Sequence, residues 1–319
     1  MGEDLPNDPR QAGERSPVVK ERIARVFLRI LEAVPLPALA LFCEAMMLLL
    51  CAVDRKHRRI ARINLRIAFP EMGDAEADRI IRTCYRRMGT SAAEFVHLPR
   101  MDAAYIREHF RIEGEEHVRK SLVGRNRPAM AMTGHFGNWE LLSHVYGAVI
   151  APVAFIVRPL KSGIMDRIVT ERRECVGNTV IRKADSAKEV MKVLRKRILV
   201  GILIDQNVDR HKGILVDFFT RKAYTTFGIA RLALAMHAAI HPAFIFRDPA
   251  RKFHHVLRFG PPIAIDPGAP REEEVARVTR RCNEEMEKAI REAPDQWMWF
   301  HRRWKTRPVG EPEIYRGLQ

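Results

Sequence analysis

Beyond about residue 125, short apolar runs alternate with longer stretches in which apolar residues recur every three or four positions. Short apolar runs are typical of buried strands, and the three-to-four spacing is typical of amphipathic helices. The predicted strands occupy residues 128–133, 152–157, 178–181 and 199–204. The predicted helices occupy the segment after Asn138 and residues 163–176, 186–197 and 271–291. This alternation predicts an α/β fold with a mixed, largely parallel sheet flanked by helices.

The longest apolar run lies nearer the N-terminus. Residues 34–53, VPLPALALFCEAMMLLLCAV, contain one charged side chain, that of Glu44. A helix needs about 20 apolar residues to cross a bilayer, so this run predicts an N-terminal hydrophobic membrane helix. A buried core helix stays open as the alternative, because a carboxylate in the middle of a bilayer is costly.

A basic segment, DRKHRRIARINLR, follows this run directly. Its basic side chains are Arg55, Lys56, Arg58, Arg59, Arg62 and Arg66. Basic residues beside an apolar helix mark the cytoplasmic side of a membrane and suit anionic lipid headgroups. A solvated helix face is the alternative interpretation.

These differences in polarity and charge divide the chain into four parts. Residues 1–22 are polar and contain three prolines, so we expect a disordered tail. Residues 23–66 are expected to form the membrane-anchoring helix and its basic flank. Residues 67–308 are expected to form the main α/β domain, and residues 309–319 a C-terminal tail.

Composition narrows the class of protein and leaves its partners open. The 319 residues are 47% hydrophobic and 29% charged, which excludes a disordered polyelectrolyte and a multi-span membrane protein. Lys and Arg number 55 against 39 Asp and Glu, a net charge of +16. Nucleic acid, an anionic membrane and acidic substrates or carrier proteins could each account for this charge. Five scattered cysteines without a Cys-x-x-Cys pair indicate neither a disulfide framework nor a zinc site.

The strongest chemical signal is TGHFGNWE, residues 133–140, at a predicted strand-to-helix junction. Ligands bind at the carboxyl ends of strands in open α/β sheets. There, His135 could take a proton from an attacking hydroxyl while Glu140 orients its ring. Amides at the helix start could stabilise an oxyanion, so the motif favours acyl transfer to an alcohol. The same five-residue spacing joins His97 to Asp102, with Pro99 between them, and we interpret that match as fortuitous.

Several longer blocks resemble one family. They are TGHFGNWE, RPLKS from Arg158, DQN at 205–207, DFFTRKAYTTFGIARLA from Asp217, WMWFHRRWKTRP from Trp297 and RINLRIAFPEM from Arg62. In this order they resemble the bacterial lipid A late acyltransferases, the lauroyl and myristoyl branch of the lysophospholipid acyltransferase superfamily. The resemblance spans roughly residues 25–308.

The resemblance implies an enzyme on the cytoplasmic face of the inner membrane. It would move a fatty acyl group from acyl carrier protein, or acyl-CoA, to a hydroxyl of an anionic lipid A precursor, with no cofactor. By this similarity His135 is the general base and Glu140 its orienting partner. Arg158, Arg173 and Asp205 are the implied substrate-binding residues.

Other interpretations stay open on the sequence alone. The arginines could form surface ion pairs and Asp205 could cap a turn. The tryptophans near residue 300 suit either a core or a membrane interface. Another glycolipid or phospholipid could be the acceptor, since acceptor choice depends on the pocket walls. A basic nucleic-acid-binding protein is the alternative of a different class, although no nucleic-acid-binding motif occurs and the resemblance implies no nucleic-acid partner.

Overall fold

The computed structural model describes residues 9–182 and 186–318. Its main sheet has seven strands in the order β1-β9-β8-β2-β5-β3-β4, and a separate hairpin joins β6 to β7. The strands of the main sheet are β1 (Phe110–Glu113), β2 (Ala129–Thr133), β3 (Val153–Val157), β4 (Thr179–Arg182), β5 (Leu199–Leu203), β8 (Ala239–Arg247) and β9 (His255–Phe259). The hairpin is β6 (Gly213–Val216) and β7 (Ala223–Thr226). Neighbours in the main sheet are parallel except β8 and β9, so the predicted mixed, largely parallel α/β fold is confirmed.

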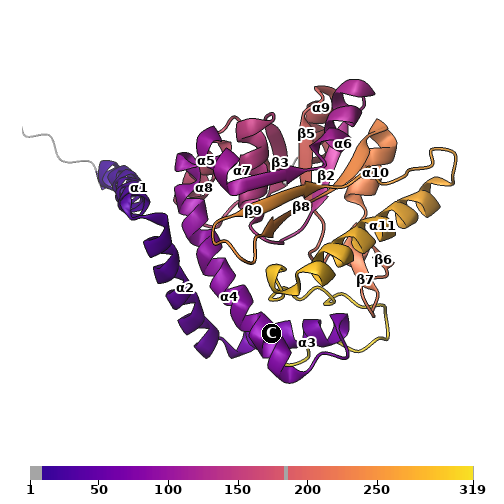
Figure 1. Cartoon of the computed structure of the whole chain (residues 1–319), viewed down its shortest axis with the longest axis horizontal. Helices are drawn as coiled ribbons and strands as arrows, with labels where there is room; N and C mark the ends of the chain where they lie inside the picture. The colour runs from indigo at the N-terminus through magenta and orange to yellow at the C-terminus, as the bar shows by residue number, and fades with distance from the viewer. Residues whose placement is uncertain (1–8, 183–185, 319) are drawn as a thin grey trace, which may run out of the picture.

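Helices cover both faces of this sheet (Figure 1). They are α1 (Pro9–Ala33), α2 (Leu36–Val53), α3 (Arg55–Ala68), α4 (Asp74–His97), α5 (Ala103–His109), α6 (Glu115–Arg119), α7 (Trp139–Val149), α8 (Gly163–Glu174), α9 (Ser186–Arg195), α10 (Gly228–Met236) and α11 (Arg271–Glu292). Short 3-10 turns occupy Leu98–Arg100, Arg210–Lys212 and Pro294–Gln296, and a π turn occupies Lys120–Gly124. The helices predicted after Asn138 and from residues 163, 186 and 271 are therefore α7, α8, α9 and α11.

Alternate residues of the central strand β2 point into two different cores, as the pleat of a strand requires. Ala129 and Ala131 pack in the core that α7 covers, together with Leu141 and Val145. Met130 and Met132 pack in the larger core on the other face, beneath α10 and α11. Because both faces of β2 are buried, its carboxyl end is held rigidly at one edge of the sheet.

The predicted apolar helix is α2, and it lies along α4 (Figure 1). Among the described residues it is the one helix long and apolar enough to span a membrane. Its carboxylate, Glu44, is 9% exposed because it faces α4. It accepts a hydrogen bond from Thr90 Oγ1 at 2.7 Å and pairs with Lys252 Nζ at 2.7 Å. These partners account for a charged residue in the middle of an apolar helix.

The predicted tail over residues 1–22 is wrong from Pro9 onward, where α1 begins. Residues 1–8 lie outside the described part of the chain. The helix forms because Val19, Ile23, Phe27 and Ile30 recur at helical spacing on one side, while its opposite side pairs with α8.

The predicted boundaries at residues 66 and 308 do not separate units in the structure. Helix α3 runs across the first boundary to Ala68, and its Asn64 is fully buried. Beyond the second boundary, Tyr315 is 5% exposed and donates a hydrogen bond from its hydroxyl to Asn64 Oδ1 at 2.5 Å. The C-terminal segment up to Leu318 therefore packs against the domain and is not a free tail. The composition of residues 309–319 did not indicate these contacts.

Candidate active site

The motif TGHFGNWE forms the turn between β2 and α7. Gly137 has a positive φ of 60°, and a Cβ at this position would lie 1.9 Å from the carbonyl oxygen of Ile245. Its amide donates a hydrogen bond to the Gln296 carbonyl at 2.8 Å, and the Met298 amide donates one to the His135 carbonyl at 3.0 Å. Glycine thus permits a close backbone approach that fixes the position of His135.

Asp205 holds the His135 ring. The Nδ1 atom of His135 lies 2.9 Å from Asp205 Oδ1, and the His135 amide donates to Oδ2 at 2.8 Å. The indole nitrogen of Trp297 donates to the same Oδ2 at 2.8 Å. The Asp205 side chain is 3% exposed and that of His135 is 18% exposed. The pairing assigns the proton on Nδ1 to this hydrogen bond, which leaves Nε2 as a proton acceptor.

The prediction that Glu140 orients His135 is wrong in this structure. Glu140 instead accepts two hydrogen bonds from Arg173, from Nε at 2.9 Å and from Nη2 at 2.6 Å. Glu140 lies in the first turn of α7, and its side chain reaches α8. Asp205 follows β5, which pairs in parallel with β2, so the residues after the two strands lie side by side. Ile204 also donates a hydrogen bond from its amide to the Thr133 carbonyl at 3.1 Å, which holds the two strand ends together. The sequence indicated only that Asp205 follows an apolar run, at the end of a strand where ligands bind.

His135 and Asp205 each shift the pKa of the other. Burial alone lowers the pKa of His135, but the charge and hydrogen bond of Asp205 outweigh it, so the pKa is raised. Burial raises the pKa of Asp205, but the charge and hydrogen bonds of His135 outweigh that effect and lower it to about 2. Asp205 is therefore ionised near neutral pH and stabilises an imidazolium on His135.

The pKa of His135 is expected to fall below its ordinary value in Asp205→Asn. Removal of the carboxylate charge leaves burial, which disfavours the imidazolium, as the dominant influence. Titration of the His135 ring by NMR measures this pKa. Glu140→Gln is the matched control and should lower the pKa less, because Glu140 contributes the smallest of the named interactions. A larger fall in Glu140→Gln than in Asp205→Asn would contradict this assignment.

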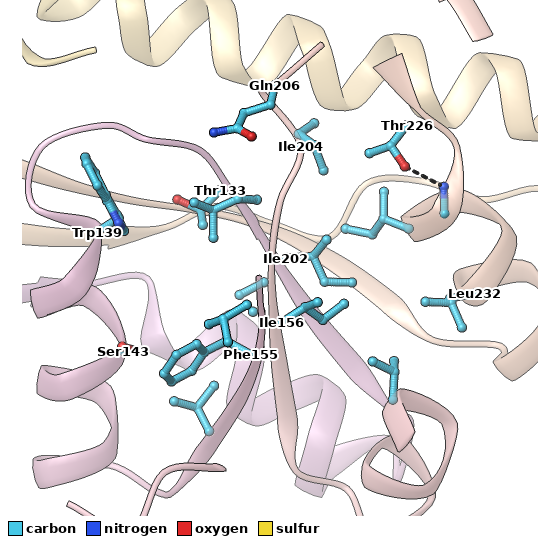
Figure 2. A pocket seen from close by; sticks show the side chains of 18 of the residues that line it. Thr133, Trp139, Ser143, Phe155, Ile156, Ile202, Ile204, Gln206, Thr226 and Leu232 are labelled. Atoms are coloured by element: carbon cyan, nitrogen blue, oxygen red, sulfur yellow. Dashed lines mark hydrogen bonds between the residues drawn. The ribbon is translucent and has the colours of Figure 1, made fainter. Parts of the chain in front are cut away.

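Two cavities meet at His135. One, of about 670 Å³, lies among β2, β3, β5, α7, α9 and α10, and Figure 2 shows apolar side chains such as Phe155 and Ile202 around it. The other, of about 490 Å³, lies among α1, α4, α7 and α8. His135, Trp139, Glu140 and Arg173 border both. A catalytic base at such a junction can act between two bound molecules.

The larger cavity passes through the sheet. The parallel pairing of β3 with β5 runs from Val153–Leu199 to Phe155–Gly201 and stops there, although both strands continue. Residues from both faces of the sheet line the cavity, including Phe155 on one face and Ile202 on the other. The gap between the two strands is thus an apolar passage that ends beside His135.

The five predicted site residues come together at the carboxyl edge of the sheet. Arg158 directly follows β3, is exposed and borders the larger cavity, and Arg173 reaches the site from α8. Asp205 lies beneath His135. The alternatives of a remote surface ion pair for Arg173 and of a simple turn cap for Asp205 do not fit these positions.

The sequence matches a model of the bacterial lipid A biosynthesis acyltransferases over residues 20–306. The chain belongs to this family. The lipid A biosynthesis palmitoleoyltransferase of Escherichia coli (strain K12) is 27% identical over 265 residues, which cover 82% of this chain and 83% of the relative. The lauroyltransferase of the same strain is 26% identical over 262 residues, 82% of this chain and 83% of the relative. Its myristoyltransferase is 23% identical over 265 residues, 83% of this chain and 80% of the relative.

The acyltransferase also contains a buried polar network that sequence reasoning missed. Glu94 of α4 accepts hydrogen bonds from Arg247 at 2.7 and 3.0 Å and pairs with His255 at 2.9 Å. It also accepts one at 2.8 Å from Asn138, the residue before α7. Burial raises the pKa of Glu94, but the charges of Arg247 and His255 outweigh it and hold that pKa far below its ordinary value. The sequence feature that could have indicated this network is the single carboxylate of Glu94 among small and apolar residues in SAAEFV, residues 91–96.

The C-terminal aromatic segment of the acyltransferase belongs to the core. Trp297, Trp299 and Trp304 are at most 2% exposed, which decides against their placement at a membrane interface. His301 accepts a hydrogen bond at 2.7 Å from the amide of Asn207, and burial lowers its pKa to about 4. This neutral histidine fixes the chain just after Asp205, which gives Asn207 a structural role.

Proposed function

We propose that this acyltransferase moves a fatty acyl chain from acyl carrier protein to a hydroxyl of a lipid A precursor. It acts at the cytoplasmic face of the inner membrane, with His135 as general base. The observation that carries the proposal is the His135–Asp205 pair at the junction of two apolar cavities. Two lipid-bearing substrates need two such cavities and one base between them.

The chemical step needs one base and a site for negative charge. His135 Nε2 takes the proton of the acceptor hydroxyl as its oxygen attacks the thioester carbonyl carbon. The C–S bond then breaks, and the departing thiolate takes the proton from the imidazolium. Asp205 stabilises that imidazolium throughout. The Gln206 side-chain nitrogen lies 3.3 Å from Nε2, so the acceptor hydroxyl must replace this contact when it binds. The released amide is then a hydrogen-bond donor for the reacting carbonyl oxygen.

Charged residues at the cavity borders suit anionic substrates. Arg158 is exposed at the border of the larger cavity, and Arg231 and Arg271 line the same cavity. Arg173 borders both cavities, and Glu140 fixes its guanidinium through two hydrogen bonds. Guanidinium groups bind phosphate and carboxylate groups well, so we assign Arg158 and Arg173 to substrate binding.

The passage between β3 and β5 is proposed to hold the acyl chain, which makes Gly201 a determinant of chain length. Gly201→Val should shift preference toward shorter chains, by about tenfold if roughly two methylenes lose their burial. Gly201→Ala is the matched control, because a Cβ there meets its nearest atom at 3.5 Å, an ordinary contact. Mass spectrometry of products from mixed acyl donors measures the shift. An unchanged product distribution in Gly201→Val would place the acyl chain elsewhere.

Mass spectrometry of lipid A from cells that lack and then regain this protein tests the function as a whole. The wild type should restore a missing acyl chain and His135→Ala should not. Unchanged lipid A, with a new acyl chain on another glycolipid or phospholipid, would identify a different acceptor for the same chemistry.

A further inference from the structure

Helix α2 is attached to the catalytic domain along its whole length. Three hydrogen bonds join its two ends and its middle to α4. They link His97 Nε2 to the Val34 carbonyl at 3.0 Å, Thr90 Oγ1 to Glu44 Oε1 at 2.7 Å and Tyr85 Oη to Asp54 Oδ2 at 3.1 Å. At Gly89, a Cβ would lie 2.6 Å from the carbonyl oxygen of Cys43, so the two backbones nearly touch. The two helices therefore move as one body.

Helix α1 is attached to the same domain through α8. Arg25 Nη1 pairs with Glu171 at 2.6 Å, Arg167 pairs with Glu21, and Arg172 pairs with Glu32. These three ion pairs occupy one side of α1. Ile23, Phe27 and Ile30 lie on the opposite side, because they are offset from the paired residues of α1 by about half a helical turn.

The outer sides of the two helices form one uncovered apolar surface, which we call the α1–α2 surface. Its largest contributors are each 58% to 68% exposed: Ile23, Phe27, Ile30, Leu41, Phe42, Leu49 and Val53. In Figure 1 both helices run down one edge of the molecule, outside α4 and α8. Contiguous apolar surface of this extent marks a membrane or protein contact.

Basic side chains border this surface. Arg55 and Arg59 are exposed where α3 leaves the end of α2. Arg82 and Arg86 are exposed on α4, the helix that runs beside α2, and Lys252 reaches Glu44 from the loop before β9. An apolar strip with cationic borders matches the acyl chains and the phosphates of an anionic bilayer surface.

The same neighbours argue against a helix that crosses the bilayer. If α2 spanned the membrane in this arrangement, α4 would enter the hydrocarbon with it. Helix α4 would then carry exposed Arg82 and Arg86 and the buried Glu94 network into the membrane, and charged groups are costly there. Only the outer side of α2 can meet acyl chains without this cost.

We propose that α1 and α2 lie in the plane of an anionic lipid bilayer and dock the acyltransferase on one leaflet without crossing it. This inference rests on the membrane association proposed above. It places the 490 Å³ cavity at the lipid surface, because Leu28 of α1 and the exposed Leu160 and Met165 line it. A lipid acceptor can then enter sideways from the leaflet and reach His135 without passing through water.

Topology of the full-length protein separates the two arrangements. An N-terminal epitope tag and a C-terminal tag are each tested for protease protection in inverted membrane vesicles and in spheroplasts. In-plane docking puts both tags on the same side of the membrane. Tags on opposite sides would show that α2 crosses and would overturn the proposal.

Vesicle binding tests the surface itself. Wild-type protein should sediment with vesicles of phosphatidylglycerol and phosphatidylethanolamine. The double variant Phe27→Glu, Leu49→Glu should bind at least about tenfold more weakly, since two deeply seated apolar side chains become charged. Val123→Glu is the matched control, because Val123 is 76% exposed in the turn that directly follows α6. Helix α6 lies on the opposite side of the molecule from α1 (Figure 1), so this variant should bind as wild type does.

The remaining outcomes are decisive. Equal vesicle binding by the double variant and the control would overturn the α1–α2 surface as the docking site. Wild-type protein that does not bind vesicles but forms dimers, together with a monomeric double variant, would show that a second copy covers the surface. That result would overturn the proposal. Acyl transfer measured in detergent micelles is independent of docking, so retained activity in the double variant separates this inference from the proposed function.

Discussion

Replacement of His135 by alanine is expected to lower kcat for acyl transfer by about 10²- to 10⁴-fold, the usual contribution of a general base. The expectation follows from geometry: His135 Nδ1 is held by Asp205, while Nε2 lies at the junction of both cavities. The backbone contacts of His135 remain available to alanine, so the variant should fold. Transfer from a labelled acyl carrier protein thioester to a purified lipid A precursor measures the change.

Asp205→Asn and Glu140→Gln are informative companions to this variant. Asp205→Asn should approach the loss seen in His135→Ala, because an orienting carboxylate that also stabilises imidazolium is worth several orders of magnitude in hydrolytic triads. Glu140→Gln should raise KM more than it lowers kcat, since Glu140 positions Arg173. Full activity in purified His135→Ala would remove the base assignment altogether.

Glu94→Ala should destabilise the fold by about 3–5 kcal/mol, the usual cost of leaving a buried charge without its partner. Arg247 is 9% exposed and would lose its buried carboxylate, and Asn138 would lose its acceptor at the start of α7. Denaturant unfolding of detergent-solubilised protein, followed by circular dichroism, measures the loss. Glu189→Ala is the matched control, because its ion pair with Lys192 is exposed and should change stability by less than about 1 kcal/mol. A similar small effect for both variants would contradict a structural role for the network.

The sheet was predictable where apolar runs alternate with polar turns. Strands β2, β3, β4 and β5 and the helices between them follow that rule, since each strand is short and bounded by loop residues. Strands β8 and β9 were missed, in part because Pro242 interrupts the apolar run of β8. Helix α1 was missed because prolines and charges near residue 9 conceal the apolar spacing that starts at Val19.

The residues of the candidate site were predictable from the sequence, but the hydrogen bond between His135 and Asp205 was not. His135, Glu140 and Asp205 were all identified, but sequence distance favoured Glu140 as the partner of His135. Asp205 lies 70 residues away and becomes a neighbour only because β2 and β5 pair in parallel. Long-range strand order is a property of the whole chain, so a local motif cannot reveal it. The same limitation applies to Trp297 and to Glu94, whose partners come from distant segments.

The early end of the pairing between β3 and β5 sets the opening that we propose for the acyl chain. The size of the opening depends on where two strands stop sharing hydrogen bonds, so the backbone itself sets it. One further bonded residue pair would close about 3.3 Å of the opening along the strands, and one fewer would lengthen it equally. Relatives with this architecture could therefore differ in acyl preference by whole steps of the strand ladder, with the catalytic residues unchanged.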